Sequence, residues 1–510
     1  MKTPALSRRS LVLGVPLGVP LLAGACSSSG NNPIAFSGGD TKNPGATGPA
    51  EEEVVLVAGQ TGPITPLLTP KADLVMADGA ERHISYAPDV PPQIVRAQQR
   101  IFETRLEVTE GVCPLDPAND VTFEMWGYRI EGDEEVTCGT PGPVLRGRVG
   151  DVARIVMTNA AGNNHPHNID FHAITGQGGG AADLTAAPGE TVAIEIRLLY
   201  PGAFMYHCAF GDVPEHISRG MYGMFIVDPE RPLPDVDHEW AVMQSEWYVT
   251  PPDADGVVEF DRQALSDENP AYVTFNGRTG ALTGDNSLHM SVGERARIYM
   301  VNEGLNLNSN WHPIGSHWDT VYPEAATHPA NNPIRGSQST LVVTGGATVT
   351  ELVGVVPSTI ILVDHALSRA FYKGAIGMVV VDGDVDPEIF EVVAAGGATA
   401  DPAAEEATAA NVVTITDGAW DPGNAELAYS PRAITVATGT TITWNNNDAV
   451  LHTVTAGVSN GSVGDPSGEF DSGDLLAGES FSHTFNEVGE FPYFCTPHPW
   501  MTGTVVVEAA

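Results

Sequence analysis

The sequence predicts an all-β protein built from three Greek-key β-sandwich domains. Its 510 residues give room for three domains of ordinary size. The chain contains 55 glycines and 39 prolines, which divide it into short segments. Between these turn signals the segments are rich in valine, isoleucine and threonine, as β-strands are. The short strands and frequent turns together favour sandwiches over helical or mixed folds.

The first 26 residues (1–26) have the pattern of an export signal. Arg8 and Arg9 precede an apolar run from 11 to 22, and this segment resembles a twin-arginine signal. The run ends in Leu-Ala-Gly-Ala-Cys26, which resembles a bacterial lipobox and implies that Cys26 is lipidated. The alternative is an ordinary cleaved signal in which Cys26 is incidental. We expect an exported protein, periplasmic or at the cell surface, held to the membrane by a lipid anchor.

Residues 27–90 are rich in Gly, Ser, Pro and Ala, which is the composition of a linker. Strand patterns begin at residue 91, and we predict the first sandwich over 91–232. Its expected strands are 105–109, 121–128, 141–151, 152–158, 191–198 and 222–227.

The second sandwich is predicted over 233–385, and its first strand over 240–249. This domain has no cysteine, so it cannot supply a thiolate. Residues 386–410 are rich in Ala, Gly and Glu and form a second predicted linker. The third β-domain is predicted over 411–510.

The charge of the chain argues against nucleic acid as a partner. The formal net charge is −40, from 64 acidic residues against 24 lysines and arginines. Nucleic-acid binding requires clustered Lys and Arg. We therefore predict no nucleic-acid partner.

The first domain contains the donor set of an electron-transfer copper site. Cys208, His216 and Met221 follow the spacing Cys-x7-His-x4-Met, and His167 lies upstream. Two imidazoles, one thiolate and a weak axial methionine suit a mononuclear copper that carries one electron. Structural zinc usually takes more cysteines or a closed Cys/His set. We predict a copper on these four residues, the alternative for Cys208 being a buried thiol.

The third domain repeats this donor set. Cys495, His498 and Met501 are packed into one Cys-x2-His-x2-Met loop, and His452 lies upstream. This short spacing is a specific signal, so we predict a second electron-transfer copper here.

A different copper centre is predicted on His172, His207 and His365. Side chains alternate between the faces of a strand, so His172 should point away from His167, and His207 away from Cys208. Three imidazoles without a thiolate leave a position open for a small ligand. The alternative for any one of them is a packed core or surface histidine.

Asp170 and His312 are the predicted proton donors to a bound oxyanion. A carboxylate and an imidazole near a metal suit general acid chemistry near neutral pH. The alternatives are an ordinary strand residue for Asp170 and a packed loop residue for His312. His165, His317 and His328 receive no firm role.

Five cysteines are present, and three of them have the roles given above. The remaining two, Cys113 and Cys138, would form a disulfide in an oxidising compartment. The alternative is a pair of buried thiols.

Residues 91 to 384 resemble the copper-containing nitrite reductases, which have two cupredoxin domains and work as homotrimers. The segments that carry this resemblance are His167–Gly176, Tyr206-His-Cys-Ala, Phe275-Asn-Gly, Gly280–Gly284 and Val363-Asp-His365. The short spacing from Cys208 to His216 is most similar to lipid-anchored, outer-membrane members. The last hundred residues resemble small cupredoxins of the amicyanin and plastocyanin kind.

The resemblance implies three coppers per subunit: two of type 1, at the cysteine sites, and one of type 2. The type 2 copper would take His172 and His207 from one subunit and His365 from its neighbour. Asp170 and His312 match the family's proton-handling pair. The implied reaction is the one-electron reduction of nitrite to nitric oxide with two protons consumed. Most members lack the third domain, which we expect to be a tethered electron donor, itself supplied by a c-type cytochrome or a quinol-linked chain.

Two other classes of protein are alternatives. A multicopper oxidase needs repeated His-x-His pairs, including a His-Cys-His run, but this chain has Tyr206-His-Cys-Ala and one His165-Pro-His. An electron carrier with two type 1 coppers would not need the histidines and the aspartate of a third centre. The number of coppers per subunit separates these classes.

Overall fold

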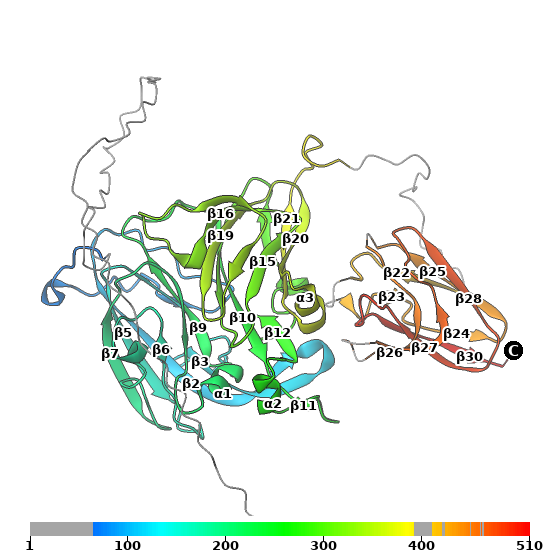
Figure 1. Cartoon of the computed structure of the whole chain (residues 1–510), viewed down its shortest axis with the longest axis horizontal. Helices are drawn as coiled ribbons and strands as arrows, with labels where there is room; N and C mark the ends of the chain where they lie inside the picture. The colour runs from blue at the N-terminus through cyan, green and yellow to red at the C-terminus, as the bar shows by residue number, and fades with distance from the viewer. Residues whose placement is uncertain are drawn as a thin grey trace, which may run out of the picture. The chain divides into compact units, whose positions relative to one another are not determined.

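The computed structural model describes residues 65–391, 411–420, 424–448, 450–459, 461 and 464–509. The predicted export signal at 1–26, the predicted lipidation site Cys26 and most of both predicted linkers lie outside these residues. The described part of the chain forms six β-sheets, two in each predicted domain (Figure 1). The all-β prediction is therefore confirmed.

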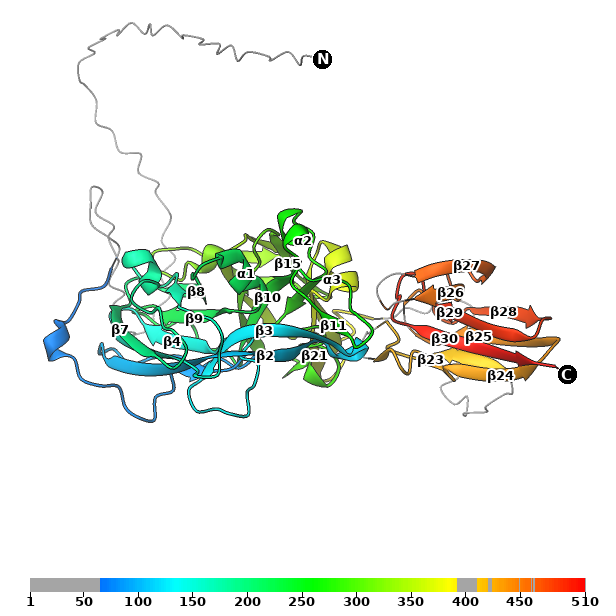
Figure 2. The same cartoon turned by 90° about the horizontal axis from the view of Figure 1, so that it is seen from below.

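The first domain is a sandwich of two five-stranded sheets. One sheet has the order β1 (Ile84–Ser85), β4 (Val144–Arg148), β9 (Tyr222–Asp228), β8 (Gly202–His207) and β6 (Asp170–Phe171). The other has the order β11 (Val257–Val258), β3 (Val121–Ile130), β2 (Ile101–Asp116), β5 (Val152–Asn159) and β7 (Thr191–Arg197). Figure 2 shows β2 and β3 as a long pair. Along β2, Phe102, Thr104 and Leu106 are buried between exposed residues, as the two-residue period of a strand requires.

The linker predicted over 27–90 is wrong at its C-terminal end. Ile84 pairs with Leu145, which makes β1 an edge strand of the first sandwich. The neighbouring His83 is buried, stacks on Phe102, and donates from Nδ1 to the carbonyl oxygen of Arg146 over 2.8 Å. A strand of two residues is too short to leave a periodic signal in the sequence. The linker-like composition of residues 27–90 therefore gave no indication of β1.

The second domain is also a sandwich. Its six-stranded sheet has the order β12 (Tyr272–Phe275), β10 (His238–Trp247), β14 (Arg295–Asn302), β19 (Ala347–Val353), β16 (Trp318–Tyr322) and β17 (Ile334–Ser337). Its five-stranded sheet has the order β13 (Leu288–Ser291), β21 (Ile376–Asp382), β20 (Ser358–Asp364), β15 (Ser309–Ile314) and β18 (Thr340–Val342).

The first two domains are joined more closely than separate sandwiches would be. β11 follows β10 in the chain, yet it pairs in parallel with β3 of the first domain. The fully buried Arg146 of β4 forms ion pairs with Asp228, at 2.8 Å, and with Glu239 of β10, at 2.6 Å. A buried guanidinium is tolerated when carboxylates pair with it in this way, so the contact fixes the junction.

The third domain has a four-stranded and a five-stranded sheet over its own hydrophobic core. The first has the order β23 (Tyr429–Ser430), β22 (Val412–Ile415), β25 (Thr440–Asn446) and β28 (Ser480–Phe485). The second has the order β24 (Ala433–Ala437), β30 (Thr502–Glu508), β29 (Gly489–Phe494), β26 (Thr455–Ser459) and β27 (Gly464–Asp471).

Helices are few and short. The α-helices of the described residues are α1 (Val213–Ser218), α2 (Arg262–Ser266) and α3 (Leu367–Lys373). The 3-10 turns are η1 (Lys71–Asp73), η2 (Pro117–Asn119), η3 (Gln177–Gly180), η4 (Gly284–Asn286) and η5 (Pro323–Ala325). None of these helices is long and apolar enough to cross a lipid bilayer.

Candidate metal centres

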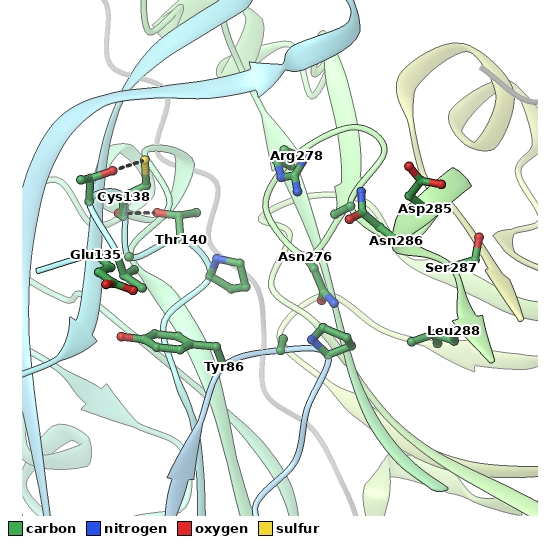
Figure 3. Close-up of a pocket in the computed structure, with 17 residues that line it drawn as sticks. Tyr86, Glu135, Cys138, Thr140, Asn276, Arg278, Asp285, Asn286, Ser287 and Leu288 are labelled. Atoms are coloured by element: carbon green, nitrogen blue, oxygen red, sulfur yellow. Dashed lines mark hydrogen bonds between the residues drawn. The ribbon is translucent and has the colours of Figure 1, made fainter. Parts of the chain in front are cut away.

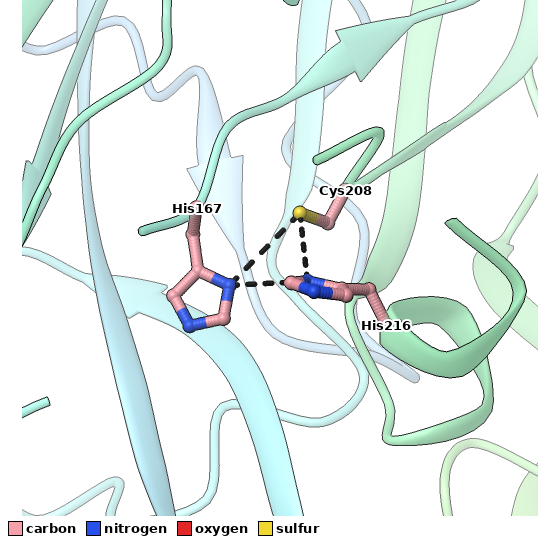
Figure 4. A group of neighbouring side chains, drawn as sticks. All are labelled: His167, Cys208 and His216. Carbon is pink, nitrogen blue, oxygen red and sulfur yellow. Dashed lines mark hydrogen bonds between the residues drawn. The ribbon is translucent and has the colours of Figure 1, made fainter. Parts of the chain in front are cut away.

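Three donor side chains of the first domain converge where β8 ends (Figure 4). Cys208 Sγ lies 3.2 Å from His216 Nδ1 and 4.0 Å from His167 Nδ1, and the two Nδ1 atoms are 3.3 Å apart. Cys208 directly follows β8, and α1 carries His216. Met221 is fully buried in the same hydrophobic core as Cys208, and its carbonyl oxygen accepts from the Cys208 N–H at 3.1 Å. The four residues predicted for this site therefore lie together.

The protonation of this group suits a soft metal ion. Burial, together with repulsion from His167, lowers the pKa of His216 to about 4, so its Nδ1 is available to bind. Burial also raises the pKa of the Cys208 thiol, so the metal itself would have to displace the thiol proton. One sulfur and two imidazole nitrogens, all within 4.0 Å of one another, fit a type 1 copper, and the buried Met221 is hydrogen-bonded to Cys208 through its backbone.

Asp170, His172 and His207 form a second group on the other face of the same strands. β6 and β8 pair in a register that sets Asp170 opposite His207, and His172 Nε2 lies 3.3 Å from His207 Nε2. His207 Nδ1 lies 3.0 Å from the carbonyl oxygen of Cys208. A carbonyl oxygen only accepts, so Nδ1 carries the proton and Nε2 is the nitrogen left for a metal. The alternation of faces thus separates His207 from Cys208 as predicted.

His312 and His365 form a pair in the second domain. Their ring centroids are 5.1 Å apart, since His312 lies on β15 and His365 directly follows the adjacent β20. His312 Nδ1 donates to the carbonyl oxygen of Gln338 over 2.5 Å. His365 is exposed, and the described residues of one chain do not place it in the group of Asp170, His172 and His207. The three histidines predicted to share a metal are therefore divided between two sites of a single chain.

The donors predicted in the third domain also lie together. Cys495 Sγ lies 3.6 Å from His452 Nδ1 and 3.5 Å from His498 Nδ1, and these two nitrogens are 3.0 Å apart. The Cys495 N–H donates to the carbonyl oxygen of Met501 at 3.1 Å, as its counterpart does in the first domain. Burial raises the pKa of Cys495 to about 11, whereas burial and repulsion from His452 lower that of His498 to about 4. This group fits a copper for the same reasons as the first.

Sequence reasoning missed two carboxylates next to these groups. Glu110 Oε1 lies 2.9 Å from His167 Nε2, and Asp448 Oδ2 lies 2.8 Å from His452 Nε2. Burial opposes ionisation of Glu110, but the N–H groups of Asn164 and His165 and the ring of His167 outweigh it and lower its pKa to about 2. Asp448 stands four residues before His452, a spacing that was visible in the sequence. Glu110 is far from His167 in the chain, so no local sequence pattern predicts this contact.

Two further features do not include any of the predicted metal ligands. The sulfur atoms of Cys113 and Cys138 are bonded to each other, as predicted. A hollow of about 860 Å³ lies between the loop 135–141 and the loop 276–288, and none of the predicted metal ligands lines it (Figure 3). The chemistry suggested by the donor groups therefore does not belong to this hollow.

Comparison with known proteins identifies two families of domain. Residues 416–508 match copper binding proteins of the plastocyanin/azurin family, and residues 114–231 match the multicopper oxidase family. The chain is 39% identical over 321 residues to the copper-containing nitrite reductase of Neisseria meningitidis serogroup B. The matched region covers 63% of this chain and 78% of the relative. It is 30% identical over 405 residues to the enzyme of Pseudomonas chlororaphis, covering 76% of this chain and 98% of that relative.

The chain belongs to the copper-containing nitrite reductases. It is also similar to the solved copper nitrite reductase of Nitrosomonas europaea, with 32% identity, a TM-score of 0.48, and coverage of 57% of this chain and 96% of that one. This nitrite reductase carries a further cupredoxin domain at its C-terminus, where the plastocyanin/azurin family matches. It is an NO-forming copper oxidoreductase, and the carrier without a catalytic centre is thereby set aside.

Proposed function

We propose that this nitrite reductase binds three coppers per subunit and that the donor groups described above hold them. His167, Cys208, His216 and Met221 would hold one type 1 copper, and His452, Cys495, His498 and Met501 the other. His172 and His207 would hold the type 2 copper together with His365. When bound, the coppers supply one-electron chemistry and an open position for an oxyanion.

The observation that carries this proposal is the adjacency of His207 and Cys208. The side chains of these neighbours belong to two different donor groups, because they extend from opposite faces of the chain where β8 ends. One peptide unit therefore joins a donor of the electron-accepting centre to a donor of the nitrite-reducing centre. A covalent route this short suits transfer of one electron for each nitrite reduced.

We further propose that the enzyme works as a homotrimer. The pair His172 and His207 offers two imidazoles, while His365 is exposed in the second domain beside His312. Each half is an incomplete ligand set, and a neighbouring subunit can complete both at once. A shared site of this kind would make assembly necessary for activity.

Asp170 and His312 are the proposed proton donors to nitrite. Asp170 lies beside the imidazoles of His172 and His207, close enough to reach a ligand held by them. His312 is oriented through Nδ1 by the Gln338 carbonyl, which leaves Nε2 facing away from that contact. Nitrite reduction to nitric oxide and water consumes two protons, and one carboxyl and one imidazole can deliver them.

The third domain is the proposed electron donor to the first type 1 copper. Residues 386–410 would tether it at an effective concentration of about 1 mM. A c-type cytochrome or a quinol-linked chain would reduce it in turn. We propose likewise that residues 1–26 direct export and that Cys26 carries a lipid anchor, which would hold the enzyme in the periplasm or at the cell surface.

Nitric oxide release under anaerobic conditions tests this function. The copper-loaded protein is reduced with an artificial donor, nitrite is added, and nitric oxide is followed with an electrode. We expect nitrite-dependent release and three coppers per subunit by metal analysis. Two coppers per subunit without nitric oxide release would contradict the proposed type 2 site, and more than three coppers with oxygen consumption would contradict the proposed set of donor groups.

A further inference from the structure

Both thiolate sites share an arrangement that the ligand motifs do not include. In each, a carboxylate oxygen lies behind the upstream histidine, on the ring nitrogen remote from the cysteine. The distance is 2.9 Å from Glu110 to His167 Nε2 and 2.8 Å from Asp448 to His452 Nε2. The Glu110 side chain is 4% exposed and the Asp448 side chain 0%. The same device therefore occurs in two domains whose metal loops differ in length.

Each carboxylate is held by groups other than the histidine. Glu110 accepts from the backbone N–H of Asn164 and of His165, both at 2.9 Å. Asp448 accepts from the backbone N–H of Gly418 at 3.3 Å and of Trp420 at 3.2 Å. Because these backbone N–H groups hold the carboxylates in place, each carboxylate sets the orientation of the histidine ring beside it.

The chemical consequence concerns both the tautomer and the charge of the histidine. An ionised carboxylate only accepts hydrogen bonds, so Nε2 of each ring must carry the proton, and Nδ1, which faces the cysteine, is left with its lone pair. Carboxylates in this position also make a ligand imidazole more basic, which favours the more highly charged state of a bound metal.

We infer that Glu110 and Asp448 are positioning residues that select the metal-binding tautomer of His167 and His452 and lower the reduction potential of each copper. This inference rests on the proposed function, because it takes both donor groups to be type 1 copper sites. It gives the upstream histidine of each site a carboxylate partner that lies outside the loop carrying the other ligands.

Isosteric amides test the inference in the full-length, copper-loaded protein. Glu110→Gln is placed in a Cys495→Ser background, so that only the first-domain site contributes the visible thiolate–copper band, and Asp448→Asn is placed in a Cys208→Ser background. Glu107→Gln is the matched control, because Glu107 lies on the same strand β2, accepts at 2.8 Å from the partly buried Arg129 and not from a predicted ligand, and loses the same charge. The ratio of oxidised to reduced copper is then read from the band during a redox titration.

We expect each amide to shift this ratio at least tenfold toward the reduced form at a fixed potential, which is 59 mV for a one-electron couple. The control should shift it less than twofold. Loss of copper from Glu110→Gln, with an apoprotein that unfolds at the same temperature as the control, would also support tautomer selection. Shifts equal to that of the control, with copper retained, would overturn the inference, and Asp448→Asn provides an independent trial in the other domain.

Neither measurement uses nitrite. If the inference is wrong, the amide variants leave the potentials unchanged and the protein still releases nitric oxide. If the proposed function is wrong, no nitric oxide is released, whatever the potentials of the two sites are.

Discussion

The two thiolate sites use the same four donor types, but they differ at the residue before the cysteine. In the first domain this residue is His207, whose imidazole belongs to the second donor group. In the third domain it is Phe494, which is buried and offers no metal donor. The first-domain site is thus connected by its own backbone to the second donor group, whereas the third-domain site is not. Under the proposed function, the first-domain site delivers electrons to the nitrite-reducing centre and the third-domain site only carries them.

The loops around the two sites differ as well. Seven residues separate Cys208 from His216, and they include part of α1, whereas two residues separate Cys495 from His498. His216 is 7% exposed, while His498 is half-buried. The shorter loop leaves the imidazole edge more accessible, which suits a domain that exchanges electrons with other proteins.

Replacing His207 with phenylalanine tests the comparison most directly, because it makes the first domain resemble the third. We expect the visible thiolate–copper band to persist and nitrite reduction to fall by more than about 10³-fold, since the type 2 centre loses a ligand and even the loss of an outer-shell partner costs about 10- to 100-fold. Spectra and nitric oxide release measure the two effects. His289→Phe, at an exposed position on β13, is the control and should leave both unchanged. A His207→Phe enzyme that still reduces nitrite would contradict the proposed division between the two sites.

Asp170→Asn affects only the centre that the third domain lacks. We expect copper content to stay the same and turnover to fall about 10² to 10⁴-fold, the usual contribution of a positioned proton donor. Asp183→Asn, at an exposed position in the same segment, is the matched control. Undiminished nitrite consumption by the Asp170 variant would refute its assigned role.

Removing the third domain by ending the chain after residue 390 tests its role as a carrier. Turnover with a redox-protein donor should fall about 10²-fold as the tethered site is lost, while turnover with a small artificial reductant should not change. Cys495→Ser in the full chain should reproduce this pattern, because it removes the thiolate and keeps the domain. Equal losses with both donors would count against a donor role.

The disulfide offers a smaller contrast in stability. Cys113 and Cys138 are 25 residues apart, and closing a loop of this length contributes about 3.5 kcal/mol in the chain-entropy account. Changing both to serine should lower the calorimetric unfolding temperature of the first two domains. The third domain contains no such bridge, so its own transition should not move and serves as the internal control. A uniform shift of every transition would show that the effect is not local to the disulfide.

Much of the grouping of these side chains could be predicted from the sequence because the candidate ligands are close together in the chain. Cys495, His498 and Met501 fall within one loop, and His207 and Cys208 are neighbours, so spacing and alternation were enough to predict which side chains lie together. The all-β fold followed in the same way from short segments between glycines and prolines. The predicted strands of the first domain are all present, with β2 longer than expected.

The features that the sequence did not reveal depend on contacts between distant segments. Glu110 reaches His167 only because β2 passes behind the loop that carries the histidine. β1 has two residues and is stabilised by pairing with β4, not by its own composition. Neither contact leaves a periodic or local trace, so neither could be assigned before the fold was known.

The pairing of β11 with β3 of the first domain has a consequence for how this enzyme can be divided and recombined. Dividing the chain between residues 232 and 233 would remove β11 from the first sandwich, so that β3 would become an unpaired edge strand. The second sandwich would keep Val257–Val258 without the strand it pairs with. The first two domains should therefore be expressed and engineered as one unit. The C-terminal cupredoxin has both its sheets within its own sequence, so it is the portion of the chain that gene fusion can add, exchange or discard.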